Sequence, residues 1–136
     1  MKRYKLEISE DQMLVLEEAL EVFSRLGTKQ YDILASHIEH GKYGLNWEKR
    51  LELDKKIKEI EGMADKPCYG INSPEISDKF RVSYDMIQVL RYVRSWSNAE
   101  HSPEERTSNF IKYMSLNYDE PLKTGKEPLA KCELID

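Results

Sequence analysis

The chain has 136 residues and a formal net charge of −4, and hydrophobic residues make up 40% of it, enough for one hydrophobic core. We therefore expect a single domain over residues 1–136. The acidic balance argues against a binder of duplex nucleic acid, because neutralising phosphates requires a basic surface. No apolar run approaches the ~20 residues that cross a bilayer. The first residues also lack the apolar core of a secretory signal, so we expect a cytoplasmic protein without membrane contact.

Both ends of the sequence alternate between apolar and charged residues. The segments are residues 3–8 (RYKLEI) and residues 129–135 (LAKCELI). A period of two is typical of a half-buried strand. Because a lone strand leaves an unpaired edge, we expect the two segments to pair as a small β-ribbon. That ribbon would rest on helices or be extended by a second subunit.

Helical periodicity and helix start signals occupy most of the remaining chain. Ser9 and Gln12 have the spacing of a capping box for the first helix, and Gly27 is placed to end it. A second, shorter helix is predicted from Thr28 to near Gly41. A third is predicted from the cap residue Asn46 to about Glu61, with these residues facing inward: Trp47, Leu51, Ile57 and Ile60.

Two serine–proline–glutamate sequences open the last two predicted helices. Ser73 begins the fourth helix, which ends near Asn98, and Ser102 begins the fifth. The predicted fold is therefore α+β and mainly α: about five helices and a two-stranded β-ribbon formed by the N- and C-terminal strands. The fourth helix carries an apolar seam that we expect to face the core: Val82, Met86, Val89, Val93 and Trp96.

The polar side of the fourth helix combines residue types that suit a flat, anionic ligand. Arginine offers paired donors to phosphate, tyrosine stacks on a base, and glutamine reads an amide or base edge. The plainer interpretation is a solvated face with an i,i+4 pair between Arg81 and Asp85, and an oligomer interface is a third. The candidate ligand-binding residues on this helix are Arg81, Tyr84, Asp85, Gln88, Arg91 and Tyr92.

Motifs for catalysis and metal binding are weak or missing. His37 and His40 lie three residues apart on one predicted helix face, but no HExxH or HxxxH pattern accompanies them, so we expect no metal site. We find no phosphate-binding glycine loop and no nucleophile motif, and we expect no cofactor. Cys68 and Cys132 are far apart and are expected to be free thiols.

The segments SRLGTKQYDIL and YGINSPEISDKFRVSYDMIQVLR resemble a family of small accessory proteins encoded by bacteriophages and prophages. The resemblance covers the first helix pair and the fourth helix, not the C-terminal tail. It implies a protein of the host cell cytosol, in a class that includes inhibitors of host defence. Some of these inhibitors are oligomeric sponges that sequester cyclic nucleotide signals. The recurring elements fall on Arg25, Gly27, Gln30, Pro74, Asp78, Arg81, Asp85, Gln88 and Arg91.

Three functional hypotheses follow from the residues and the resemblance. The first is a homo-oligomer that sequesters a small anionic nucleotide without catalysis; Arg25, Arg81 and Arg91 would hold its phosphates. Either tyrosine of the polar face would stack on the base, Gln88 or Gln30 would read its edge, and Asp85 would orient Arg81. The second is an inhibitor that binds a host defence enzyme or complex through protein contacts. The third is a hydrolase of a nucleotide signal.

Overall fold

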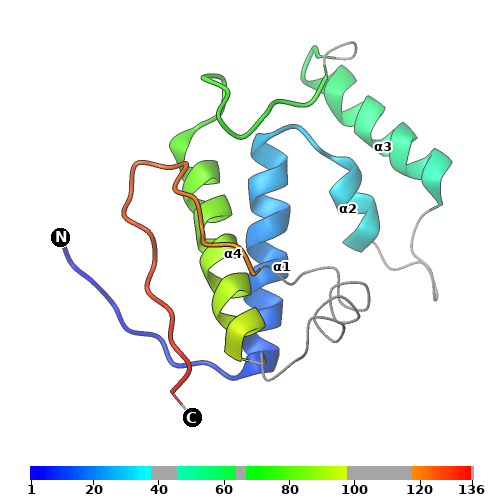
Figure 1. Cartoon of the computed structure of the whole chain (residues 1–136). Helices are drawn as coiled ribbons and strands as arrows, with labels where there is room; N and C mark the ends of the chain where they lie inside the picture. The colour runs from blue at the N-terminus through cyan, green and yellow to red at the C-terminus, as the bar shows by residue number, and fades with distance from the viewer. Residues whose placement is uncertain (38–45, 64–66, 98–117, 136) are drawn as a thin grey trace.

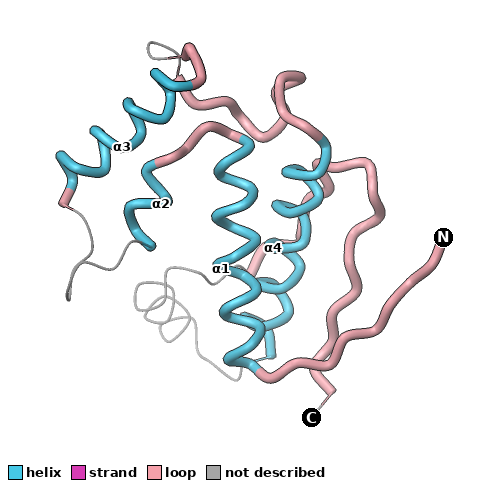
Figure 2. Tube along the Cα trace, turned by 180° about the vertical axis from the view of Figure 1, so that it is seen from behind, coloured by secondary structure: helices cyan, strands magenta, loops and turns pink. Residues whose placement is uncertain are grey.

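The structure is a computed structural model, and it describes residues 1–37, 46–63, 67–97 and 118–135 (Figure 1). Within these ranges the chain forms four helices: α1 (Glu10–Gly27), α2 (Asp32–His37), α3 (Trp47–Ile60) and α4 (Asp78–Ser97). α1 lies between α4 on one side and α2 on the other, and α3 packs against α2 (Figures 1 and 2). None of the described helices combines the length and apolar character needed to cross a membrane.

The predicted β-ribbon is wrong, because neither terminal segment of the described chain forms a strand (Figure 2). Residues 1–9 and 127–135 have no regular secondary structure, and their alternating apolar side chains are not buried: Tyr4 is 90% exposed, Leu6 71% and Leu134 64%. A two-stranded ribbon is marginal unless its apolar face is covered. The predicted fifth helix lies outside the described residues. Those residues form four helices and no strand, so the predicted α+β class is wrong and the described fold is all-α.

α1 begins as its capping residues predict, but the glycine predicted to end it has another role. Ser9 and Gln12 form the reciprocal capping box that their spacing predicts. At the other end it is Lys29, with φ of 64°, that adopts the left-handed conformation. Gly27 is needed for a close approach instead, because a Cβ there would lie 2.2 Å from Cγ of Phe80 on α4.

The interface between α1 and α4 differs from the predicted apolar seam. Ser83 and Arg94 of α4 are buried, and each bonds to α1. Among the seam residues only Val89 is buried, and Trp96 is 42% exposed. The seam lies on a neighbouring side of α4 because this helix has two partners: α1 on one side and residues 118–126 on another.

Three remaining helix predictions need correction, and the first is that α2 begins at Asp32 rather than at Thr28. α4 begins at Asp78, because the Ser73 hydroxyl accepts the Glu75 N–H within a turn that precedes the helix. Asn46 caps α3 as predicted. However, the side of α3 that packs against α2 is not the side that carries most of the residues predicted to face inward. As a result three of the four residues predicted to face inward are exposed: Trp47 at 65%, Leu51 at 50% and Ile60 at 86%.

Candidate functional site

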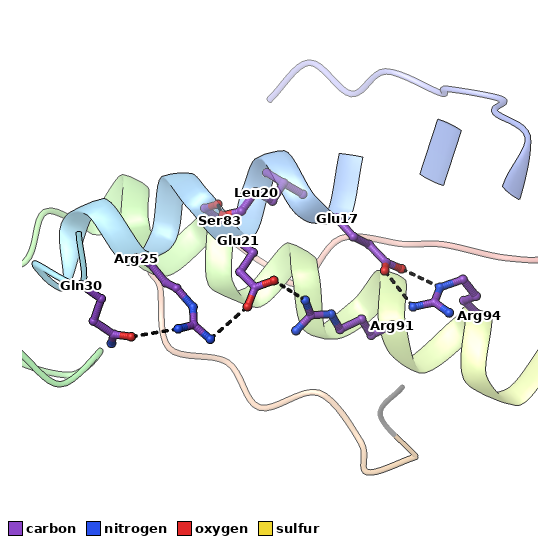
Figure 3. Close-up of polar contacts among 8 residues, drawn as sticks. All are labelled: Glu17, Leu20, Glu21, Arg25, Gln30, Ser83, Arg91 and Arg94. Atoms are coloured by element: carbon purple, nitrogen blue, oxygen red, sulfur yellow. Dashed lines mark hydrogen bonds and ion pairs between the residues drawn. The ribbon is translucent and has the colours of Figure 1, made fainter. Parts of the chain in front are cut away.

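A buried ion pair joins the middle of α1 to the C-terminal part of α4 (Figure 3). Arg94 donates from Nε and Nη2 to the two carboxylate oxygens of Glu17, at 3.0 and 2.9 Å. Both side chains are nearly excluded from solvent, with 7% and 3% of their surface exposed. Such a bidentate pair fixes the register of two helices, but its two charges offset one another and leave little net attraction for a ligand.

A second cluster, the Arg25–Glu21–Arg91 cluster, lies farther along the same interface (Figure 3). Glu21 accepts from Arg25 Nη2 at 3.0 Å and from Arg91 Nη2 at 2.8 Å. Gln30 accepts from Arg25 Nη1 at 3.2 Å. Two guanidinium groups therefore share one carboxylate, and the cluster carries an excess positive charge. The Nε of Arg91 is buried and has no hydrogen-bond partner. Three residues predicted for a ligand site meet here: Arg25, Gln30 and Arg91.

Three other predicted site residues bind the backbone of the chain itself. Arg81 donates to the carbonyls of Ile71 and Ser73, the former at 3.0 Å, and so holds the turn before α4. Asp85 is 3% exposed and accepts from Thr124 and Gly125 rather than from Arg81. Gln88 bonds to both backbone groups of Leu122. These side chains therefore position two loop segments.

The two predicted stacking residues differ in their surroundings. Tyr84 is 38% exposed and lies on the same side of α4 as Arg91, two helical turns away. Tyr92 is half-buried and makes an edge contact with Trp96, with the ring centroids 6.5 Å apart. Trp96 in turn meets Tyr118 edge-on at 5.3 Å. Tyr84 is therefore the more accessible of the two aromatic rings.

Phe23 of α1 packs on Phe80 of α4, with the ring centroids 4.9 Å apart. From Phe23 outward, away from α4, α1 has an apolar side whose residues are exposed or half-buried. We call this apolar side the outer face. Four of its residues are spaced by four, three and four along the helix, and Phe23 lies beside them. Val15 is 68% exposed, Ala19 is exposed and Phe23 is 38% exposed. A shallow groove of about 520 Å³ lies over this side of α1, and Glu18 and His37 contribute to its wall. The outer face consists of Val15, Ala19, Val22, Phe23 and Leu26.

Acidic side chains border the outer face along one edge. Glu18 lines the groove, and Asp11 lies seven residues before it on the same side of the helix. Both are exposed, and neither is part of an ion pair in the described structure. Near the other edge, the Lys79 ammonium lies 5.8 Å from the centre of the Phe23 ring. The groove thus combines an apolar floor with an acidic border on one edge and the Lys79 ammonium near the other.

A polar cluster joins the α1–α2 turn to the end of α3. Glu61 accepts from Lys29 Nζ at 2.7 Å and from the Tyr31 hydroxyl. The hydrogen bond from Lys29, followed by that from Tyr31, lowers the pKa of Glu61, and the same carboxylate raises the pKa of Lys29. Burial, with a contribution from Glu61, raises the pKa of Tyr31. A tyrosine shifted in this direction stays protonated at neutral pH, so the cluster acts as a structural tie rather than a base.

Groups suited to metal binding or thiol chemistry do not gather in the described part of the chain. No cluster of three or more histidine, cysteine, aspartate or glutamate side chains there fits a metal ion. His37 is exposed on α2, and His40 lies outside the described residues. Cys68 and Cys132 are free, as predicted. Burial raises the pKa of the Cys132 thiol, with further contributions from the negative charges of Glu17 and Glu133, which keeps it protonated.

The sequence patterns missed the outer face as a surface. Its residues were visible as an apolar stripe, and such a stripe normally indicates a core. The sequence feature that indicated an exposed apolar stripe was the polarity of the opposite side of α1, where Glu17, Glu21 and Ser24 face α4. No protein-family model, curated protein or solved structure matches this chain.

Proposed function

We propose that this chain is a non-catalytic protein-binding module that holds an amphipathic helix of another protein on the outer face of α1. One observation carries the proposal: the apolar side of α1 is exposed while its polar side is packed against α4. A contiguous exposed apolar patch is costly in water and is typical of an interaction surface. Binding of this kind requires no catalytic group.

The acidic border selects the chemistry of the partner. A helix that docks in an apolar groove contributes residues spaced at three and four, and the flanking charges set its orientation. Asp11 and Glu18 favour basic residues beside the partner's apolar stripe. The proposed occupant is therefore a basic amphipathic helix. The resemblance to phage accessory proteins would place that helix in a protein of the host's defence.

The test is a titration of the full chain with two synthetic helices, followed by fluorescence anisotropy. One helix contains leucine and lysine, and the other has the same pattern with glutamate in place of lysine. We expect the lysine helix to bind at least about tenfold more tightly, a difference of ~1.4 kcal/mol. We expect Val15→Lys/Ala19→Lys to abolish this binding, because it removes apolar surface and offsets the two negative charges of the border. Equal binding by the variant would overturn the proposal.

The matched control is Trp47→Lys/Leu51→Lys, which introduces the same two charges, also four residues apart, at exposed apolar positions on α3. It should leave the affinity of the lysine helix unchanged. Thermal unfolding of Val15→Lys/Ala19→Lys gives a second readout. We expect a midpoint close to that of the wild type, since exposed positions tolerate substitution. A large fall would mean that the chain covers this face itself, which would contradict a docking role.

The Arg25–Glu21–Arg91 cluster supports a second candidate function, the sequestration of a small anionic nucleotide. Its excess positive charge and the unpartnered Arg91 Nε favour a phosphate, and Tyr84 offers an exposed ring on the same side of α4. Under this proposal the ligand is held and not turned over. A homo-oligomer would enclose it further.

A thermal-shift panel of inorganic phosphate and cyclic nucleotides tests this second candidate. A ligand should raise the midpoint of the wild type and leave Arg25→Ala unaffected. The Arg25 side chain is 41% exposed, so its loss should change the unliganded midpoint little. Recovery of the intact ligand after denaturation would distinguish sequestration from hydrolysis. A panel with no shift would remove this candidate.

A further inference from the structure

Residues 118–126, which we call the strap, run along α4 in the opposite direction to the helix (Figure 1). Trp96 Nε1 donates to the Tyr118 carbonyl at 3.1 Å near the end of α4. Asp78 accepts the Lys126 N–H at 3.0 Å at the start of the helix. Between them lie the contacts of Asp85 and Gln88. We call the side of α4 formed by Asp78, Asp85, Gln88 and Trp96 the tail face.

The tail face recognises the strap mainly through its backbone. The Gln88 amide donates to the Leu122 carbonyl at 2.9 Å and accepts the Leu122 N–H at 3.1 Å. It therefore satisfies both backbone groups of one residue, as a neighbouring strand would. The Asp85 carboxylate accepts the N–H of Thr124 at 2.9 Å and that of Gly125 at 2.8 Å. Charged acceptors make such bonds stronger than neutral ones do.

Two positions of the strap add sequence selectivity. The Thr124 hydroxyl donates to Asp85 at 2.6 Å. Gly125 is buried, and a Cβ there would lie 3.0 Å from Val82 Cγ2 and from the Val82 nitrogen. The side chains of Leu122 and Lys123 are exposed, Leu122 at 73%. The tail face thus binds an extended segment that contains a threonine–glycine pair, and it tolerates different side chains at the neighbouring positions.

The lengths of the two partners match along the whole contact. From Asp78 to Trp96 the helix rises about 27 Å, at ~1.5 Å for each of its steps. From Tyr118 to Lys126 an extended chain covers about 26 Å, at ~3.3 Å for each residue. The contacts at Asp78, Asp85, Gln88 and Trp96 therefore meet successive parts of the strap without a slip in register.

We propose that the tail face is a peptide-binding site that also accepts the strap of a second copy of this chain, so that two copies exchange straps. Every copy carries the segment that the tail face already binds, so a second copy presents a complementary ligand. The contacts that would form between copies are the same hydrogen bonds that form within one. Leu122 remains exposed in the bound strap, so its side chain does not oppose release, whereas the edge contact between Tyr118 and Trp96 must break. This proposal does not depend on the outer face of α1.

A complementation experiment with full-length chains tests the exchange. Gly125→Val keeps an intact tail face but carries a strap that cannot seat, because its side chain would meet Val82. Asp85→Ala keeps an intact strap but lacks the acceptor for two backbone N–H groups. Native mass spectrometry distinguishes the two by mass. We expect the mixture to form a heterodimer at least about tenfold more abundant than either homodimer.

A labelled peptide of residues 118–128 gives an independent readout. It should bind the Gly125→Val chain and not the chain that also carries Asp85→Ala. A peptide with valine in place of glycine should not bind either. If Asp85→Ala fails to fold by circular dichroism, Gln88→Ala replaces it, since Gln88 is only half-buried. Folded variants that form no preferred heterodimer would overturn the proposal, even if the peptide binds, because a second copy would then not be the occupant.

Discussion

At the scale of single residues, the Glu17–Arg94 pair makes the strongest prediction about stability. Arg94→Leu should lower the free energy of unfolding by about 3–5 kcal/mol, because it leaves the Glu17 carboxylate buried and uncompensated. Urea unfolding measures the change. The double variant Glu17→Leu/Arg94→Leu should recover most of the loss, since it removes both charges together. A double variant as unstable as the single one would contradict this explanation.

Gly27 makes a second prediction at the same scale. Gly27→Ala should lower the free energy of unfolding by about 1–3 kcal/mol, because its Cβ would overlap the Phe80 ring and force the helices apart. Gly70 is the matched control, since a Cβ at that position meets no atom within 4 Å. Gly70→Ala should change stability by less than about 0.5 kcal/mol. Similar losses in chemical denaturation for both variants would rule out the close approach as the cause.

The Lys29–Tyr31–Glu61 cluster makes stability depend on pH. The folded-state pKa of Glu61 is lowered, so its contribution is present above its unfolded pKa of about 4.3 and is lost as the pH falls through the folded value. The pKa values of Lys29 and Tyr31 are raised, so their contributions are lost in strongly alkaline solution. Glu61→Gln should cost up to about 1 kcal/mol at pH 7. Thermal midpoints of the variant and the wild type should converge in acid, and a constant difference down to pH 2 would contradict the assignment.

At the scale of helices, local signals predicted where elements form better than which side they bury. The Ser9 and Asn46 caps depend on residues within one turn, so the sequence contains all the information needed. The buried side of α4 depends instead on two distant partners. Its contacts with Leu122, Thr124 and Gly125 span 34 to 40 residues, and no periodicity within the helix encodes them.

The exposed residues of α3 give a prediction that separates the sequence expectation from the structure. Ile60 was expected to face inward and is 86% exposed, whereas Ile87 on α4 is 3% exposed. Ile60→Ala should therefore change the free energy of unfolding by less than about 0.5 kcal/mol. Ile87→Ala should lower it by about 2–5 kcal/mol, since it leaves a cavity. Equal losses in urea unfolding would show that α3 packs differently.

The candidate site could be predicted only in part. Arginine, glutamine and tyrosine on the polar side of the fourth helix predicted a ligand-binding face, and Arg81, Gln88 and Arg91 bind groups of the chain itself. Their partners could not be inferred, because carboxylates and backbone carbonyls of the same chain satisfy arginine as a phosphate does. Arg25 binds Gln30 directly, but it meets Arg91 only through Glu21, which lies on the opposite helix from Arg91 and was not among the expected site residues.

At the scale of the whole molecule, the proposed docking depends on how polar and apolar surfaces are arranged on α1. A helix normally buries its apolar side and exposes its charges. Here the charged side of α1 meets α4 through Glu17 and Glu21, and the apolar side lies open beside α2. Burying the outer face against a partner would remove apolar area from water, at ~25 cal/mol for each Å². This gain drives the proposed docking.

Methyl-resolved NMR of the full chain, titrated with the leucine–lysine helix, shows where on the molecule this helix binds. If the outer face of α1 is the docking surface, the methyl signals of Val15, Val22 and Leu26 will shift. Those of Ile87 and Val89, buried on α4, will stay in place. Shifts centred on α4, or a titration that leaves the α1 methyl groups unchanged, would rule out docking on the outer face.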